Sequence, residues 1–243
     1  NLLKAFEKAE NETDQEIKQE FLNFVVIGGG PTGVEMAGSI AEIAYKTLNK
    51  EFNNFNSEDP NVYLIEANDK LLPMFSKKLS DKAEQYLNDF GVKVLKNEKV
   101  TNVNHSNVET DKRTIKSRNI IWAAGNTASS LIEKLNTITD DNGRAIVDPD
   151  CSLKNDPDVF VIGDASNHKD ISNTPLPGIA PVAMQQGKYV GKIIKNKILK
   201  MDRKPFKFSD KGMMATVGKY KAIGKIGNIE VSGFIAWVFW SVI

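Results

Sequence analysis

The sequence predicts an α/β fold built on a parallel sheet, and three observations lead to it. Continuous apolar runs at 24–28 and 62–68 are typical of buried parallel strands, which are covered on both faces. Residues 33–48 show the apolar spacing of a helix between these two strands. A glycine-rich turn at 28–33 joins the first strand to that helix. Strand, turn, helix and strand in this order predict a βαβ unit and therefore a parallel sheet.

Composition narrows the class of protein. The chain has 243 residues, which allows one large domain or two smaller ones. Its formal net charge of +1 provides no basic field, so no nucleic acid is expected as a partner. The single cysteine, Cys151, excludes an internal disulfide and a CxxC redox pair, and it fits a reducing compartment. His105 and His168 fall in predicted loops without metal-like neighbours, so we expect no metal site.

The first half of the chain alternates helices and strands around the glycine-rich turn. Residues 2–22 carry apolar positions among many charges, which predicts one or two exposed amphipathic helices. The stretch 49–60 is polar and is predicted to be a loop or an irregular helix end. A helix is predicted over 76–89 because its apolar side chains recur at helical spacing, and Gly91 ends it. Residues 92–97 then form a third strand.

The second half begins with a change of pattern. Residues 99–118 alternate loosely and carry polar turns, which predicts a small antiparallel meander. Two further strands are expected at 119–126 and 159–166, and the second is predicted to be buried and to end in Gly-Asp. The helices predicted in this half span 128–136 and 180–199.

The glycine-rich turn has the spacing GxGxxG and the strand–turn–helix context that a dinucleotide site requires. Gly28 allows the tight turn, Gly30 lets a pyrophosphate approach the backbone, and Gly33 lets the helix pack on the strand. Pro31 and Thr32 complete the turn, where the helix N-terminus offers N–H groups to an anion. The alternative is an ordinary βα turn without a ligand.

Two carboxylates accompany this turn. Glu66 closes the second strand, where a carboxylate accepts ribose hydroxyls and repels a 2′-phosphate, so NADH is expected over NADPH. The polar segment 49–60 is interpreted as an insertion that lengthens the usual spacing; the alternative for Glu66 is a solvent-facing strand end. Glu35 lies near the start of the helix, where the helix dipole alone favours it. The functional alternative places Glu35 beside the nicotinamide end of a bound dinucleotide.

Three later features point to a second nucleotide contact, although each has a structural alternative. Ala124 and Gly125 end a strand with small residues, which lets a nucleotide lie over it, or simply makes a packing turn. Gly163 allows close approach of a cofactor, and Asp164 can bond a ribose or polyol hydroxyl. The helix that follows at 180–199 could aim its N-terminus at a developing negative charge, or it is a surface helix.

The C-terminal run 231–243, VSGFIAWVFWSVI, is apolar. It is shorter than the roughly 20 residues of a membrane span. It could be an interfacial helix, a core strand or the start of a longer apolar helix; we favour a cut apolar helix or a membrane-surface segment. Trp237, Phe239 and Trp240 suit a membrane interface.

These motifs occur together in one known family. GGGPTGVEMAG, VYLIEA, IIWAAGN, VFVIGDAS and PVAMQQG follow the order found in type II NADH:quinone oxidoreductases, and the tail is similar to the membrane-binding region of that family. The resemblance covers nearly the whole chain. It implies a Rossmann-like NADH-binding domain inserted in a second, partial FAD-binding Rossmann-like domain, with a C-terminal membrane-associating segment. The implied parts are a helical connection (1–20), the NADH domain (21–126), the C-terminal half of the FAD domain (127–200) and the start of the membrane region (201–243).

The resemblance also implies roles for particular residues. The NADH contacts would be Gly28, Gly30, Pro31, Thr32, Gly33, Glu66, Ala124 and Gly125. Glu35 matches a catalytic glutamate near the nicotinamide and the quinone side of the flavin. The FAD contacts would be Gly163, Asp164, Ala180 and Pro181, and the quinone side would include Pro181, Met184 and Gln185. Many members have glutamine at the position of Pro181, which puts a quinone contact by that side chain in doubt.

The implied reaction is hydride transfer from NADH to FAD, followed by two-electron reduction of a membrane quinone without proton pumping. The family implies a peripheral protein on the cytoplasmic, inner face of the cell membrane, and it allows a homodimer. The alternative function is a soluble FAD/NAD(P)H-dependent reductase of a small electron-carrier protein. Since no earlier glycine turn precedes residue 28, we expect a fragment that begins after the first FAD half, binds flavin weakly or not at all, and is inactive alone.

Overall fold

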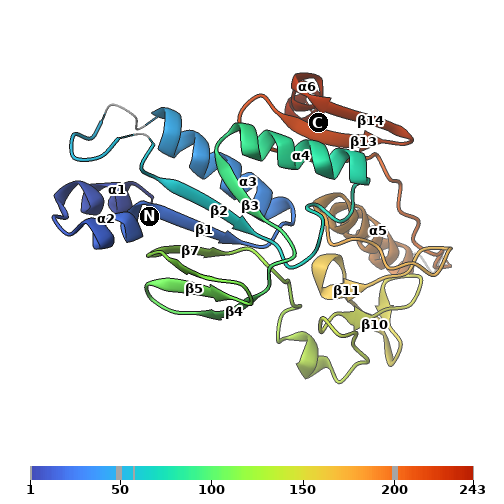
Figure 1. The fold of residues 1–243 in the computed structure, drawn as a ribbon. Coiled ribbons are helices and arrows are strands. Elements are labelled where there is room, and N and C mark those ends of the chain that lie inside the picture. The colour runs from blue at the N-terminus through green and yellow to red at the C-terminus, as the bar shows by residue number, and fades with distance from the viewer. Residues whose placement is uncertain (1, 48–50, 57, 199–201, 243) are drawn as a thin grey trace. The chain divides into compact units, whose positions relative to one another are not determined.

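The chain forms two compact units in the computed structural model, shown in Figure 1. The structure describes residues 2–47, 51–56, 58–198 and 202–242. Unit 1 consists of Asn1–Gly125 and Lys211–Ile243, and unit 2 of Asn126–Asp210. The C-terminal segment therefore belongs to the same compact unit as the glycine-rich turn.

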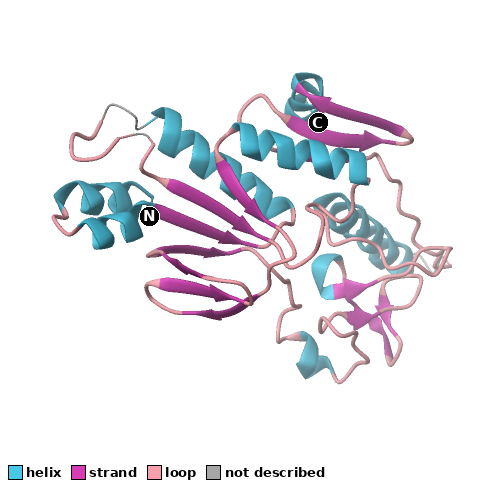
Figure 2. Cartoon of the chain, viewed as in Figure 1, coloured by secondary structure: helices cyan, strands magenta, loops and turns pink. Residues whose placement is uncertain are grey.

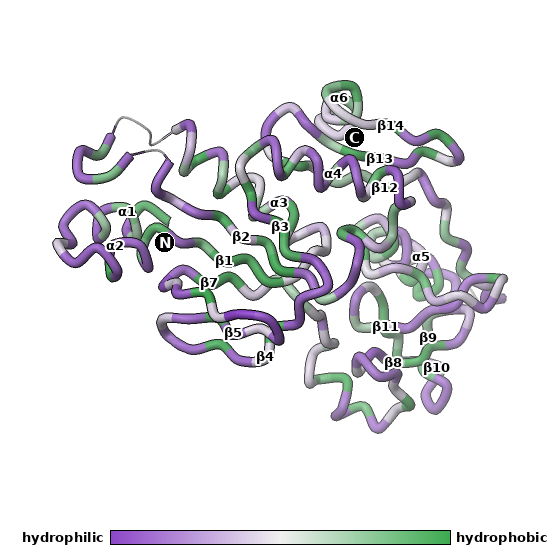
Figure 3. The backbone as a smooth tube through the Cα atoms, viewed as in Figure 1, coloured by the Kyte–Doolittle hydropathy of each residue, from purple (hydrophilic) through white to green (hydrophobic). Residues whose placement is uncertain are grey.

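Unit 1 is built on a four-stranded parallel sheet, which confirms the predicted α/β, Rossmann-like fold. Its strands are β1 (Asn23–Ile27), β2 (Asn61–Ile65), β3 (Val92–Leu95) and β7 (Asn119–Trp122). They lie in the order β3-β2-β1-β7, and every neighbouring pair is parallel. All residues of the central strand β1 are buried, as its continuous apolar sequence predicts. Figure 2 draws these strands as magenta arrows, and in Figure 3 most of β1 is coloured green, the hydrophobic end of the scale.

Helices cover one face of this sheet. They are α3 (Pro31–Glu42), which continues as the π-helical turn η1 (Ile43–Thr47), and α4 (Lys77–Asp89). Phe24 and Val26 of β1 point into the core on this face. The serine before α4, Ser76, accepts the Leu79 N–H at 3.3 Å and so begins the helix at the predicted place. The two predicted N-terminal helices are α1 (Leu2–Asn11) and α2 (Gln15–Leu22).

The predicted meander covers the other face. It consists of β4 (Val100–Val103), β5 (Asn107–Thr110) and β6 (Thr114–Lys116), paired antiparallel. Val25 and Ile27, which alternate with the helix-facing residues of β1, form a second core with Val108 and Ile115 of the meander. Successive side chains of a strand point to opposite faces, so alternate residues of β1 belong to different cores.

The C-terminal segment forms a small antiparallel sheet and a helix in unit 1. Its elements are β12 (Met213–Thr216), β13 (Ala222–Ile226), β14 (Ile229–Gly233) and α6 (Phe234–Val242). The strands contact α3 and α4. The run 231–243 is thus the end of a strand followed by a helix, with residue 243 outside the described part. No helix in the described ranges is both long and apolar enough to cross a membrane.

Unit 2 differs more from the sequence prediction. Its elements are η2 (Ile132–Leu135), β8 (Ala145–Ile146), β9 (Ser152–Leu153), β10 (Asp156–Phe160), η3 (Gly163–Ala165), β11 (Ser166–Asn167) and α5 (Ala180–Ile198). The predicted buried strand 159–166 is wrong. The strand ends at Phe160, pairs antiparallel with β9 alone and is exposed over its first residues, because no described strand lies on its other side. The predicted short helix 128–136 is only a 3₁₀ turn.

Candidate functional site

The glycine-rich turn lies where β1 ends and α3 begins, and two of its glycines are required by close backbone contacts. Gly28 has φ +111°, and a Cβ there would lie 2.8 Å from the Ala124 nitrogen. A Cβ on Gly33 would lie 1.8 Å from the Gly28 oxygen. Around Gly30, by contrast, the space is open for 4 Å. The turn therefore packs tightly against the protein and stays open where a ligand would approach.

The N-terminus of α3 is equipped for an anion. Gly30 is the N-cap and forms no side-chain capping hydrogen bond, and Pro31 is the first helical residue. The first-turn N–H groups of a helix have no intrahelical partner and carry partial positive charge. Thr32 is exposed and adds a hydroxyl at this position. The open space and the uncapped donors together fit a diphosphate group.

The carboxylate of Glu66 is held rigidly at the end of β2. Its Oε2 accepts the Gly29 N–H at 2.6 Å, which ties the strand end to the glycine-rich turn. Its Oε1 accepts the backbone and side-chain N–H groups of Asn68 at 2.8 and 2.6 Å. The sequence reasoning missed Asn68, although its place two residues beyond a strand-ending acid is a local signal for such a turn.

A cavity of about 150 Å³ opens at the carboxyl ends of β1, β2 and β7. Its lining residues are Ile27, Gly28, Ile65, Glu66, Ala67, Glu98, Lys99, Val100, Trp122 and Ala124. It thus brings together three predicted site residues from three segments of the chain. In open parallel sheets, ligands bind at this edge, where the strand order reverses.

Glu98 and Trp122 also line this cavity, and the sequence reasoning did not single them out. Glu98 is only 2% exposed, and its Oε1 accepts from the Thr110 hydroxyl at 2.8 Å and from Arg113 Nε at 3.0 Å. Trp122 is 62% exposed, and its indole N–H bonds the Ala124 oxygen at 2.6 Å. Glu98 is therefore a buried carboxylate whose charge is hydrogen-bonded, and Trp122 lines the cavity with an exposed ring.

Glu35 lies on α3 but is held by the C-terminal sheet. Its Oε1 accepts the Thr216 hydroxyl at 3.1 Å and the Thr216 N–H at 3.4 Å. Glu35 is half-buried. Thr216 was not predicted as a site residue, because the 181 positions that separate the two residues leave no local sequence signal.

The second group of predicted residues lies in unit 2. The Gly163 N–H donates to Gln186 Oε1 at 2.7 Å, and Gln186 is fully buried on α5. The amide nitrogen of Gln186 has no partner within the described structure. Asp164 stands exposed on the adjacent turn. A buried glutamine therefore fixes the turn that presents Asp164 to solvent.

The N-terminal turn of α5 is open. Ala180, Pro181 and Met184 are exposed, with Met184 at 62%. The side-chain amide of Gln185 forms two hydrogen bonds with the Ser209 backbone. Its Nε2 donates to the Ser209 oxygen and its Oε1 accepts the Ser209 N–H, both at 3.0 Å. The structure therefore places the predicted residues of this group on η3 and the start of α5.

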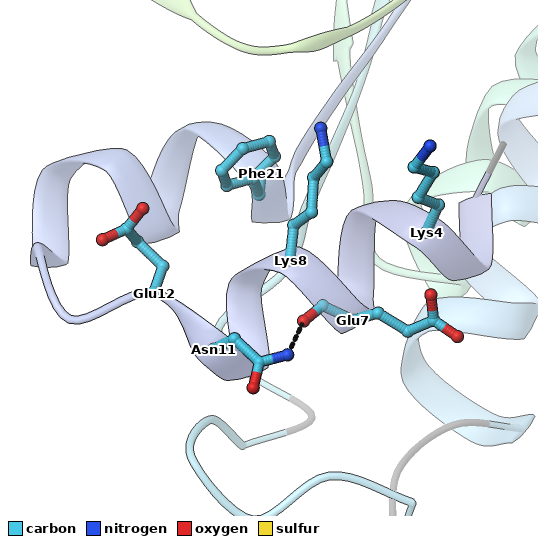
Figure 4. Close-up of a pocket in the computed structure, with 6 residues that line it drawn as sticks. All are labelled: Lys4, Glu7, Lys8, Asn11, Glu12 and Phe21. Carbon is cyan, nitrogen blue, oxygen red and sulfur yellow. Dashed lines mark hydrogen bonds between the residues drawn. The ribbon is translucent and has the colours of Figure 1, made fainter.

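A larger cavity of about 430 Å³ lies in unit 1 against α1 and α2. Figure 4 shows its residues: Lys4 and Lys8 extend the same way from α1, whereas Glu7 points elsewhere. Its lining mixes two lysines with Glu7 and Glu12, and it contains none of the predicted site residues. Because ligand sites in parallel sheets form at the carboxyl edge, we regard the smaller cavity as the candidate site.

The fold is that of a parallel α/β protein with a glycine-rich turn at the carboxyl edge of its sheet. Residues 3–187 match the model of the pyridine nucleotide-disulphide oxidoreductase family, and the chain belongs to that family. NADH and FAD, the cofactors predicted from the sequence, fit membership of this family.

Within this family, the chain is similar to type II NADH:quinone oxidoreductases. The chain is 39% identical over 254 residues to the type II NADH:quinone oxidoreductase Ndh of Mycobacterium tuberculosis, covering 100% of this chain and 54% of that protein. It is 32% identical over 222 residues to the type II NADH:quinone oxidoreductase of Staphylococcus haemolyticus, covering 87% and 53%. The resemblance drawn from the motifs is thereby confirmed. The chain spans about half the length of the curated relatives it matches.

A solved structure shares the fold. The structure of NDH2 from Plasmodium falciparum in complex with NADH superimposes with a TM-score of 0.88 at 19% identity, covering 99% of this chain and 65% of that one. At this identity the likeness establishes the fold alone.

Proposed function

We propose that the chain is the NADH-binding part, with a portion of the FAD-binding part, of an NADH:quinone oxidoreductase that does not pump protons. One observation carries the proposal: the uncapped glycine-rich turn, the tethered Glu66 and the small cavity meet at the carboxyl edge of the parallel sheet. The similarity to type II NADH:quinone oxidoreductases supports the substrate pair.

Each part of NADH has a matching feature in unit 1. The diphosphate would lie at Gly30 and Thr32, where the backbone is open and the helix N-terminus is uncapped. The adenosine ribose would bond Glu66, and the cavity beside Trp122 would take the base. Gly125, with φ +71° and no neighbour within 4 Å of a Cβ, leaves room towards the nicotinamide end. Glu35 would lie near that end.

FAD would be held in part by unit 2. Asp164 would bond the polyol chain, and Gln186 would fix the Gly163 backbone beneath it. When bound, FAD supplies the two-electron chemistry that connects hydride oxidation to quinone reduction. Ala180 and Pro181 would face its ring, and Pro181, Met184 and Gln185 would lie towards the quinone.

The proposed contact with the membrane involves α6 and the segment that precedes it. Large apolar side chains are exposed there: Tyr220, Ile229, Phe234, Ile235, Val238, Phe239 and Trp240. Exposed aromatic residues on a short helix suit the interface of a bilayer. We propose that this surface docks the protein on the cytoplasmic face of the membrane. The alternative of a soluble reductase for a carrier protein is not favoured by the relatives.

The proposal is tested by titrating the chain with NADH and NADPH while following tryptophan fluorescence. Wild type should bind NADH more tightly than NADPH. Glu66→Gln keeps an acceptor for Gly29 but removes the charge that repels a 2′-phosphate, so the preference should fall by about tenfold or more. Asp69→Asn is the matched control, because Asp69 is a neighbouring exposed carboxylate. A folded wild-type chain that binds neither nucleotide would contradict the proposal.

A further inference from the structure

One face of α3 is occupied by the C-terminal sheet. Glu35 contacts Thr216, and Glu42 accepts the Lys219 N–H at 3.1 Å. Between them, a Cβ on Gly38 would lie 2.9 Å from the Gly218 nitrogen, so the two backbones touch. Positions 35, 38 and 42 share one helical face. The turn after β12 therefore lies along the same helix whose first turn forms the dinucleotide site.

The Glu35 contact sits at the end of this face nearest the dinucleotide site. Side chains of a helix point back towards its N-terminus, and Glu35 follows Pro31 and Thr32 by four and three residues, so a Glu35 carboxylate freed from Thr216 would extend towards the first turn. In the structure, its Oε1 is occupied by Thr216 instead of the first-turn donors. A carboxylate released from Thr216 would be drawn to those donors by the helix dipole.

We propose that Thr216 is a positioning residue for dinucleotide binding. Its hydroxyl holds the Glu35 carboxylate on the C-terminal sheet and keeps that negative charge off the donors that receive the diphosphate. The inference rests on the proposed binding of NADH at the glycine-rich turn. It also gives the C-terminal sheet a direct effect on nucleotide affinity.

The test compares NADH dissociation constants of the 243-residue chain in a mutant cycle. Thr216→Val removes the hydroxyl from a side chain of similar shape and should weaken NADH binding by about three- to fivefold. Thr216→Ser keeps a hydroxyl and should bind NADH with wild-type affinity. Glu35→Gln removes the competing charge, so adding Thr216→Val to it should change the affinity less than twofold. Ser232→Ala, an exposed hydroxyl on the same sheet, is the control and should change nothing.

The outcomes separate this inference from the proposed function. If wild type does not bind NADH, the proposed function fails. If wild type binds but Thr216→Val binds equally well, or loses the same factor in the Glu35→Gln background, the positioning role is wrong. Thermal unfolding checks that each variant is folded. If the valine variant does not fold, the comparison of Thr216→Ala with Thr216→Ser decides the same point, because only serine keeps the hydroxyl.

Discussion

At the scale of single residues, the site depends on side chains held by several partners. Glu66 is tethered through both oxygens, and Glu98 is buried with two donors on one oxygen. Such charges are tolerated in a folded chain because each is hydrogen-bonded. Both residues line the same small cavity, and the backbone N–H of Glu98 donates to the backbone carbonyl of Glu66 at 3.1 Å. Backbone pairing therefore holds these two carboxylate-bearing segments next to each other at the candidate site.

The Glu98 pair yields a stability prediction. Arg113→Met would leave the Glu98 carboxylate, which is 2% exposed, with Thr110 as its remaining side-chain donor among the described residues. Because the arginine itself is 52% exposed, the full cost of breaking a buried pair is reduced by solvent screening. We expect the free energy of unfolding in urea to fall by about 1–2 kcal/mol. Lys116→Met, which breaks a solvent-exposed pair with Glu16, should have no measurable effect.

Cys151 gives a prediction about reactivity. Burial, followed by the nearby charge of Asp150, raises the pKa of its thiol to about 12. The thiol therefore stays protonated at pH 8, and the thiolate is the reactive form. Iodoacetamide should label the folded chain very slowly at pH 8 and rapidly in urea, as followed by mass spectrometry. Equal labelling rates in both conditions would refute the buried position.

At the scale of elements, two glycines of the β1–α3 junction are expected to have different roles, Gly33 in packing and Gly30 in binding. Gly33→Ala would place a Cβ 1.8 Å from the Gly28 oxygen, so β1 and α3 would have to move apart. We expect a loss of unfolding free energy of about 2–3 kcal/mol, as for overpacked cores. Gly30→Ala meets no atom within 4 Å and should leave stability nearly unchanged while weakening NADH binding. Denaturant unfolding and NADH titration of both variants measure this contrast, and equal stability of the two would contradict it.

At the scale of the molecule, the described residues form two units that differ in architecture. Unit 1 brings the first 125 residues and the last segment into one body, with the apolar surface of α6 carried on the C-terminal sheet. Unit 2 contains short two-stranded sheets and one long helix. The candidate NADH residues all belong to unit 1, and the candidate FAD and quinone residues all belong to unit 2.

The α6 surface predicts membrane binding. Phe239 and Trp240 are each 47% exposed, so replacing both with serine removes apolar area from the surface with little loss of core packing. We expect the double variant to cosediment less with anionic phospholipid vesicles than wild type, by about tenfold. NADH affinity should not change. If the vesicle-bound fraction is the same, α6 is not the docking surface.

The sequence by itself determined the parallel sheet, the glycine-rich turn between β1 and α3, and the acid at the end of β2. These follow from continuous apolar runs, glycine spacing and strand ends, which are local signals that tertiary packing did not override. Glu35 and Glu66 could be selected on the same basis. The family could be named from the order of five short motifs.

Only the tertiary structure decided which distant groups complete the site. Thr216 meets Glu35 because the C-terminal sheet packs along α3, and Glu98 reaches the cavity because β3 ends beside β2. Gln186 supports the Gly163 turn because α5 packs beneath it. The strand expected at 159–166 failed for a related reason: an apolar run becomes a buried strand only where neighbours cover it, and in unit 2 the described chain pairs it with β9 alone. Contacts between segments far apart in the chain depend on tertiary packing, so local sequence patterns do not predict them.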